Sequence, residues 1–147
     1  MDKLLQEISI EKEHIETTLD VLKEALVLPQ KKVIELSGIA SCLHHIYTGM
    51  ENIIKRILKF QKIPLPDSSS SHKDLLDIAV QQSIISSKLS DQLDTYRGFR
   101  HFFVHVYGIL LREEELQPLA VELPKVWKIF DQEVANFFET LQSDNQS

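Results

Sequence analysis

The sequence contains a single cysteine, Cys42, and has only four glycines and five prolines in 147 residues. One cysteine can form neither a disulfide framework nor a cysteine-ligated zinc site within one chain. This cysteine usage suits a reducing compartment, so we expect a cytoplasmic protein. The scarcity of glycine and proline, together with 43% hydrophobic and 26% charged residues, excludes a disordered chain and predicts a folded, helix-rich one.

Long apolar runs are also missing. No run reaches the roughly 18 residues that a membrane-spanning helix needs, and the opening segment, MDKLLQE, is too charged for a signal peptide. We therefore expect no membrane segment and no export. The formal net charge of −6 lacks the excess of lysine and arginine that broad nucleic-acid binding requires, so any RNA site has to be local.

Several motifs are missing as well. The sequence shows no alternating strand pattern, no internal repeat, no glycine-rich phosphate loop and no metal-ligand spacing. We therefore predict neither a metal site nor a cofactor. The absence of strand patterns leaves an all-α fold as the expected class.

What the sequence does contain is apolar residues at helical spacing along most of its length. The expected helices are a first of roughly 25 residues ending before Pro29, a second at about 31–62, a short third from 71, a fourth at about 90–112 and a last after Pro124. We expect residues 63–71 to form an exposed loop and residues 142–147 a frayed tail. The pattern predicts one domain over 1–147, an up-and-down bundle of about five helices.

Residues 100–107, RHFFVHVY, set an arginine, two histidines and a tyrosine into a stretch that otherwise resembles helical core. A guanidinium binds phosphate and an imidazole transfers protons near neutral pH, so this set suits phosphodiester cleavage. On helices, however, such side chains are usually solvated or hydrogen-bonded structural groups. The segment alone indicates a ribonuclease-like site without establishing it.

The spacing of these residues constrains how they could meet. Arg97, His101 and His105 are four apart and share one face of a straight helix, whereas Arg100 lies five positions before His105 and points away from it. Either the helix is distorted or begins near Arg100, which Gly98 would make easier, or a second copy of the chain completes the site in a two-fold dimer. The sequence leaves both arrangements open.

The spacing Arg100-x4-His105-x-Tyr107 resembles the R-x4-H-x-Y signature of the HEPN superfamily, specifically of its HepT-like toxins. The similarity extends to residues 46–51, IYTGME, and 72–76, HKDLL, in the same order and on similar helices, and it covers nearly the whole chain. It implies a dimeric HEPN-like domain that is a metal-independent endoribonuclease. Such a protein is the toxin of a toxin–antitoxin pair whose antitoxin is a minimal (MNT-type) nucleotidyltransferase.

The same resemblance implies roles for three residues. Arg100 would hold and polarise the scissile phosphate of the RNA substrate, and His105 would act as general base or acid when the RNA's own 2′-hydroxyl attacks. Tyr107 would be AMPylated by the antitoxin. The added bulk and negative charge would then occupy the phosphate site and repel RNA.

Other side chains receive plainer interpretations. Arg97 and His101 could support the site or be ordinary exposed groups. Glu51 could orient a catalytic side chain, but a surface ion pair is the simpler expectation. His44 and His45 are adjacent and so lie on different sides of a helix, which argues against a shared metal site and favours structural roles.

One alternative function stays open at this point. Related helical domains of the superfamily also serve as non-catalytic subunits, because a fold does not fix an activity. The chain could therefore be a helical subunit that binds a nucleotidyltransferase without cutting RNA itself.

Overall fold

The structure of the protein is a computed structural model that describes residues 1–65, 71–106 and 112–146; for residues 71, 72, 101–106, 145 and 146 it describes the backbone alone. Within these ranges the secondary structure consists of five α-helices and no strand. The helices are α1 (Asp2–Leu26), α2 (Val33–Phe60), α3 (Ser71–Gln81), α4 (Ser87–Val106) and α5 (Glu113–Gln146). The prediction of an all-α bundle of about five helices is thus confirmed.

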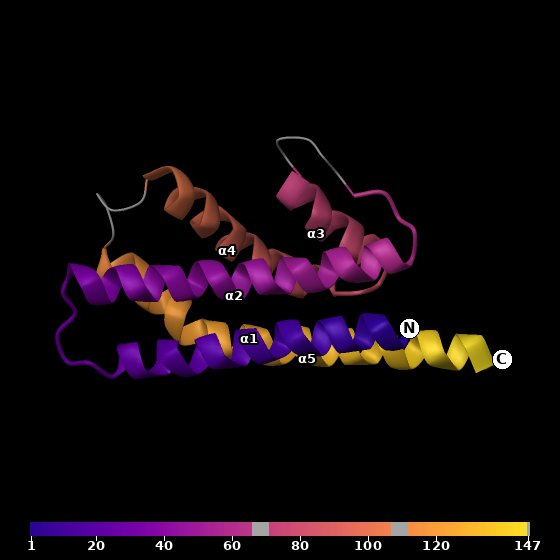
Figure 1. The fold of residues 1–147 in the computed structure, drawn as a ribbon. Coiled ribbons are helices and arrows are strands. Elements are labelled where there is room, and N and C mark those ends of the chain that lie inside the picture. The colour runs from indigo at the N-terminus through magenta and orange to yellow at the C-terminus, as the bar shows by residue number, and fades with distance from the viewer. Residues whose placement is uncertain (66–70, 107–111, 147) are drawn as a thin grey trace.

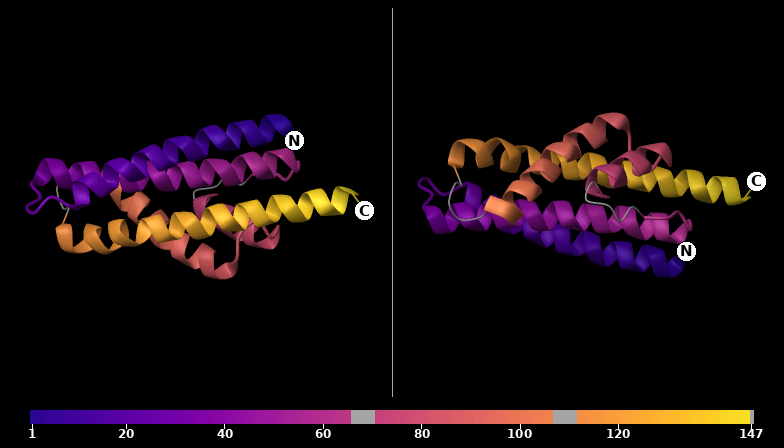
Figure 2. Two further views of the ribbon diagram at one scale, coloured as in Figure 1. Left: turned by 90° about the horizontal axis from the view of Figure 1, so that it is seen from below. Right: turned by 90° about the horizontal axis from the view of Figure 1, so that it is seen from above.

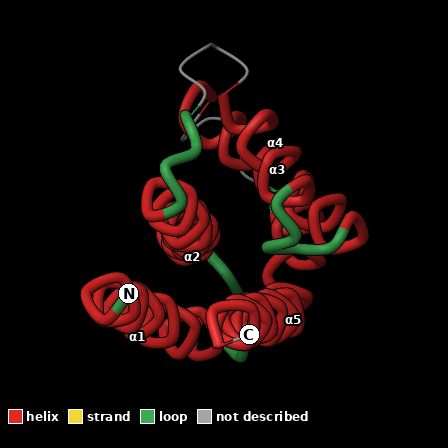
Figure 3. Tube along the Cα trace, turned by 90° about the vertical axis from the view of Figure 1, so that its right-hand side faces the viewer, coloured by secondary structure: helices red, strands yellow, loops and turns green. Residues whose placement is uncertain are grey.

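Helix α2 lies at the centre of the bundle and packs against each of the other four helices. Figure 1 shows α1 and α2 as an antiparallel pair whose connection lies at the end of the bundle opposite to the N- and C-termini. Viewed end-on in Figure 3, α1 and α5 lie side by side on one side of α2, and α3 and α4 cover the other. Both views in Figure 2 show α4 crossing obliquely to the three long helices.

The core is built from the apolar stripes of these helices. On α1 the buried positions recur every three, four or seven residues, as an amphipathic helix requires, whereas the central α2 also buries adjacent positions such as Ile39 and Ala40. Those of α1 are Leu4, Ile8, Ile15, Leu19 and Leu22. Fully burying one such side chain stabilises the fold by about 1.5–3 kcal/mol. Cys42 is buried among them, as a small apolar residue would be.

Helix α2 begins and ends with recognisable caps. At its start, the backbone N–H of Lys32 donates a hydrogen bond of 3.0 Å to the carboxylate of Glu35. At its end, Lys62 takes a left-handed conformation with φ 61°. The N–H of Ile63 then donates to the carbonyl oxygen of Leu58 at 2.9 Å, which is the Schellman motif of helix C-termini. Residues 63–65 follow as the first, non-helical part of the predicted loop, and residues 66–70 lie outside the described residues.

The connection between α3 and α4 begins with a second Schellman motif, which closes α3. Ser83 has φ 60°, and the N–H of Ile84 donates to the carbonyl of Ala79 at 2.9 Å. Helix α4 starts at Ser87, three residues before the predicted start, because Ser86 caps it: the Ser86 hydroxyl accepts a hydrogen bond of 3.1 Å from the N–H of Leu89.

Helix α5 differs most from the sequence-based expectation. It begins at Glu113 instead of after Pro124 and contains both Pro118 and Pro124. Each proline removes one helical hydrogen bond, yet the chain stays helical because its first turns bury three apolar residues, namely Leu116, Ala120 and Leu123. Figure 1 shows the expected consequence, since the orange start of α5 is bent relative to its yellow end.

The C-terminal segment also differs from its expectation. Residues 142–146, for which the sequence predicts a frayed tail, continue α5 in the structure. They contain neither proline nor glycine, so the backbone hydrogen bonds of the helix can extend through them. Among all the described residues, no helix combines the length and the apolar character needed to cross a membrane.

Candidate functional site

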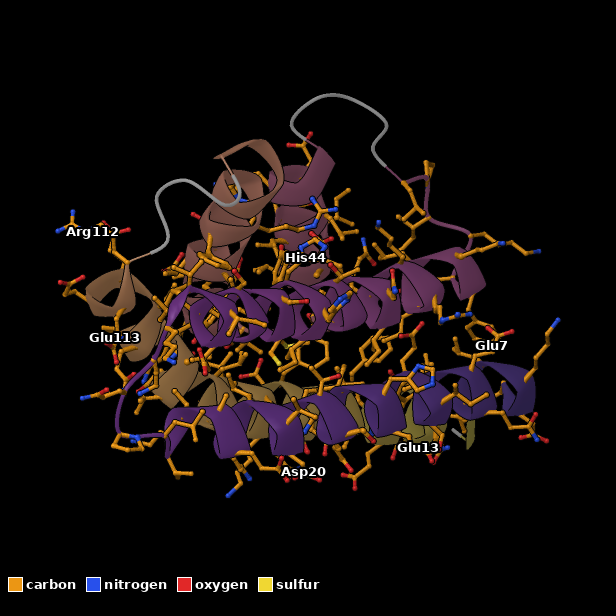
Figure 4. The ribbon with its side chains drawn as sticks, turned by 60° about the vertical axis from the view of Figure 1, so that its left-hand side comes forward. Glu7, Glu13, Asp20, His44, Arg112 and Glu113 are labelled. Atoms are coloured by element: carbon orange, nitrogen blue, oxygen red, sulfur yellow. The ribbon has the colours of Figure 1, made fainter. Side chains whose placement is uncertain are left out.

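Three chemistry-bearing side chains form one stripe on α2. His44, Tyr47 and Glu51 are spaced by three and four residues, so they lie along the same face of the helix. Tyr47 and Glu51 are 1% and 2% exposed, whereas His44 is half-buried. Figure 4 shows His44 projecting from α2 toward the side of the bundle where α3 and α4 lie. Burying a carboxylate costs free energy unless a positive group compensates its charge. Glu51 therefore needs positive partners.

Those partners come from α4, which packs against α2. Arg97 and Arg100 are one turn apart on α4, and both are partly buried. Arg100 acts electrostatically on His44 and Tyr47, and Arg97 acts on Tyr47. The charge of Glu51 acts in turn on Arg97.

These interactions follow the order expected of two antiparallel helices. Residues later in α2 interact with residues earlier in α4. We call the five residues His44, Tyr47, Glu51, Arg97 and Arg100 the α2–α4 cluster. Its members come from two helices far apart in the sequence, so the cluster exists only in the folded chain.

Arg97 also has an ion-pair partner on α4 itself. Its Nε donates to the carboxylate of Asp94 at 2.6 Å, in an i,i+3 ion pair whose side chains are about one third exposed. The hydrogen bond to Asp94 is the main cause that raises the pKa of the Arg97 guanidinium. Arg97 is therefore fixed in position and permanently charged.

The protonation states of the cluster follow from burial and charge. Burial lowers the pKa of His44 below its ordinary value, and the positive charges of Arg100 and His45 lower it further, against a smaller opposing effect of Glu51. Burial and then the charge of Glu51 raise the pKa of Tyr47. At neutral pH the cluster therefore presents a neutral imidazole and a neutral phenol beside two guanidinium groups.

The sequence left two arrangements open for Arg100 and His105, and the course of α4 bears on both. Helix α4 begins at Ser87 and is α-helical without interruption to Val106. Gly98 takes no unusual backbone conformation there. At about 100° per residue, positions 100 and 105 point about 140° apart. The structure therefore excludes the arrangement in which the helix is distorted or begins near Arg100. A single copy of α4 does not bring Arg100 and His105 together.

The structure places the other predicted residues as follows. Arg97 and Glu51 belong to the α2–α4 cluster. Glu51 is 2% exposed, so the simpler expectation of a surface ion pair is wrong, because its side chain is buried where its charge acts on Arg97. For His101 and His105 only the backbone is described, and Tyr107 lies outside the described residues.

Sequence reasoning missed His44. It assigned both His44 and His45 to structural roles on different sides of the helix. In the structure His44 is half-buried and His45 is exposed, and their rings meet edge-on with 5.5 Å between the centroids. The available signal was the spacing of His44 with Tyr47 and Glu51, which places an imidazole on the stripe of the IYTGME segment. Among the described residues, no three His, Cys, Asp or Glu side chains lie together so that they could hold a metal ion.

Comparisons with known proteins agree with this architecture. A family model described as "HepT-like protein" matches residues 38–141, a range that contains the whole α2–α4 cluster. No curated protein matches the sequence. The solved structure of YutE, a cytosolic protein of unknown function from Bacillus subtilis, superposes with a TM-score of 0.63 at 21% identity over 88% of this chain and 91% of that one. At that identity, the likeness shows the fold alone.

Proposed function

Because the chain belongs to the HepT-like protein family, we propose that it is the toxin of a toxin–antitoxin pair and acts as a metal-independent endoribonuclease. The observation that carries this proposal is the placement of Arg100, which α4 holds partly buried beside the neutral imidazole of His44. A planar guanidinium offers five N–H donors and suits a phosphate better than an ammonium group does. It would bind the scissile phosphate and stabilise the charge that develops there.

The proposed catalytic pair is Arg100 and His105, arranged across two copies of the chain. Because positions 100 and 105 diverge on one α4, a phosphate held by Arg100 would meet His105 of a second protomer in a two-fold dimer. Such a dimer would present each residue twice in one cleft. The net charge of −6 then confines RNA binding to this cleft, since the surface as a whole does not attract phosphate.

The regulatory proposal concerns Tyr107, which an MNT-type nucleotidyltransferase antitoxin would AMPylate. The burial of the other tyrosines supports this choice: the chain has three tyrosines, and Tyr47 and Tyr96 are 1% and 3% exposed. A modifying enzyme acting on the folded protein cannot reach a phenol that is covered in this way. Tyr107 is therefore the tyrosine left for modification.

Cleavage of RNA in the presence of EDTA tests the nuclease proposal. We expect the wild-type protein to cut, and Arg100→Ala and His105→Ala each to lose on the order of 10²–10³ in rate, as when one oxyanion donor or one acid–base group is removed. The matched control is Arg112→Ala, because the Arg112 side chain is 64% exposed and its ion pairs with Glu114 and Glu115 are long, at 3.9 Å each. Full activity in the Arg100 or His105 variant would remove that residue from the mechanism.

Growth and mass measurements complete the test. Expression without the antitoxin should arrest growth, and His105→Ala should relieve the arrest. Co-expression with the nucleotidyltransferase should add the mass of AMP to wild type and to Tyr47→Phe but not to Tyr107→Phe. A wild-type protein that binds the nucleotidyltransferase but neither cuts RNA nor arrests growth would instead be the non-catalytic binding subunit.

A further inference from the structure

We propose that His44 is the proton acceptor for the attacking 2′-hydroxyl of the RNA and acts beside Arg100 of the same protomer. This inference rests on the nuclease function proposed above and extends it. It assigns His105 to the other proton transfer, which the motif leaves open between base and acid. The site then contains two imidazoles with separate tasks.

The position of His44 is the first argument. It belongs to the α2 stripe that faces α4, and it is the member of that stripe nearest to the N-terminal end of α2. Because the two helices are antiparallel, this end of the stripe meets the later part of α4, where Arg100 lies. His44 is half-buried, while Tyr47 and Glu51 are buried, so His44 is the group on the stripe that a substrate can reach.

The orientation of the imidazole is the second argument. The Nδ1 atom of His44 is buried, so we assign the proton transfer to Nε2. Figure 4 shows the side chain directed away from α2 toward the α3–α4 side. Because Arg100 acts electrostatically on His44, the proposal places a phosphate bound by Arg100 on this side of the imidazole. The ribose that carries the attacking hydroxyl is bonded to that same phosphate.

The surroundings of His44 are the third argument. Among the described residues, the charged groups that act on it are Arg100 from α4 and His45 and Glu51 from α2. Burial and the two positive groups lower its pKa. The imidazole is then unprotonated at pH 7 and able to accept a proton. His45, one residue away, is exposed, and its ring lies edge-on to that of His44 with 5.5 Å between the ring centroids.

The reaction can be written with every bond accounted for. Nε2 of His44 takes the proton of the 2′-hydroxyl as the 2′-oxygen forms a bond to phosphorus, and Arg100 stabilises the charge on the phosphoryl oxygens. The bond between phosphorus and the 5′-oxygen breaks, and that oxygen takes a proton from protonated His105. The products are a 2′,3′-cyclic phosphate and a free 5′-hydroxyl. Exchange of protons with water restores both imidazoles.

The test compares His44→Gln with His14→Gln, because an amide keeps polarity but accepts no proton near pH 7 and His14 is exposed on α1. We expect His44→Gln to lose on the order of 10²–10⁴ in kcat/KM, a typical range for one acid–base group, and His14→Gln to keep the wild-type value. The fall of kcat/KM at acid pH, which reports the base of the free enzyme, should disappear in His44→Gln. A His44→Gln protein that folds normally by urea unfolding and keeps the rate and this acid limb would overturn the proposal.

A second substrate separates the two imidazoles. In a nucleoside 3′-(p-nitrophenyl phosphate), the 2′-hydroxyl still attacks but the nitrophenolate leaves without a proton. His105→Ala should therefore recover activity on this substrate, and His44→Gln should not. Recovery by His44→Gln alone would exchange the two roles and refute the assignment. If wild type cuts neither substrate, the nuclease proposal itself fails, and this outcome is distinct from a failure of His44 alone.

Discussion

Gly49 and Gly98 form a matched pair for testing how tightly α1 and α2 pack. Both are interior helix residues, but a Cβ atom on Gly49 would lie 2.7 Å from Cγ1 and 2.9 Å from Cδ1 of Ile15, whereas one on Gly98 would meet nothing within 4 Å. Optimal carbon–carbon contacts are about 3.5–4.0 Å. Ile15 is 2% exposed and, being β-branched on a helix, is held close to one rotamer. It cannot move away without cost.

The magnitude of the effect follows from two contributions. Replacing glycine by alanine in a helix interior stabilises by about 1 kcal/mol, and this gain applies equally to Gly49→Ala and Gly98→Ala. Overpacking in the core costs about 1–3 kcal/mol, and only Gly49→Ala incurs it. We therefore expect Gly98→Ala to be more stable than wild type, and Gly49→Ala to be about 1–3 kcal/mol less stable than Gly98→Ala.

Urea unfolding measures this difference directly. With a slope of about 2 kcal/mol per molar urea, a difference of about 2 kcal/mol separates the two midpoints by about 1 M. Ile15→Ala removes the clashing atoms, so Gly49→Ala should become stabilising in that background. Equal midpoints for the two glycine variants, or no coupling between positions 15 and 49, would refute the reasoning.

Three further predictions concern contacts between helices and the effect of pH. The Glu133 carboxylate accepts hydrogen bonds from the N–H and the hydroxyl of Ser86 at 2.6 and 2.9 Å; Glu133→Ala should cost about 1 kcal/mol and lower the Tm by about 2–4 °C, while an unchanged Tm would contradict the role of this cap. The hydroxyl of Tyr96 donates to the carbonyl of Leu119 at 2.8 Å; Tyr96→Phe should cost about 1 kcal/mol in urea unfolding, and an equal midpoint would show that the bond contributes nothing. Folding raises the pKa of Tyr47, so its contribution is complete below pH 10, where unfolded tyrosine is still protonated, and is lost as pH rises further. Wild type should therefore lose stability above about pH 10 faster than Tyr47→Phe, and parallel pH curves would exclude Tyr47 as a cause.

The parts of the fold that the sequence predicts well are those controlled by local periodicity. The stripes of α1 and α2 lie where the spacing of leucine and isoleucine places them, and Pro29 follows the end of α1, because both signals act within a few turns of one helix. The start of α5 could not be obtained in the same way. Local rules end a helix near Pro118 and Pro124, but burial of one face against the bundle outweighs the lost hydrogen bonds.

The candidate site shows the same division. The motif predicts roles for Arg100, His105 and Tyr107 from spacing alone, since all three lie within eight residues, and these roles stay predictions. His44 and the burial of Glu51 depend on which turn of α2 meets which turn of α4. That register is set by tertiary packing and is not encoded in either helix by itself.

The position of the chain ends in Figure 1 has a practical consequence. Both termini lie at one end of the bundle. The α1–α2 connection and the C-terminal end of α4 lie at the opposite end. A fluorophore or surface tether attached at either terminus would leave the motif-bearing pole unobstructed. Single-molecule capture of RNA or of a second protomer could then be followed from that pole without steric interference from the attachment.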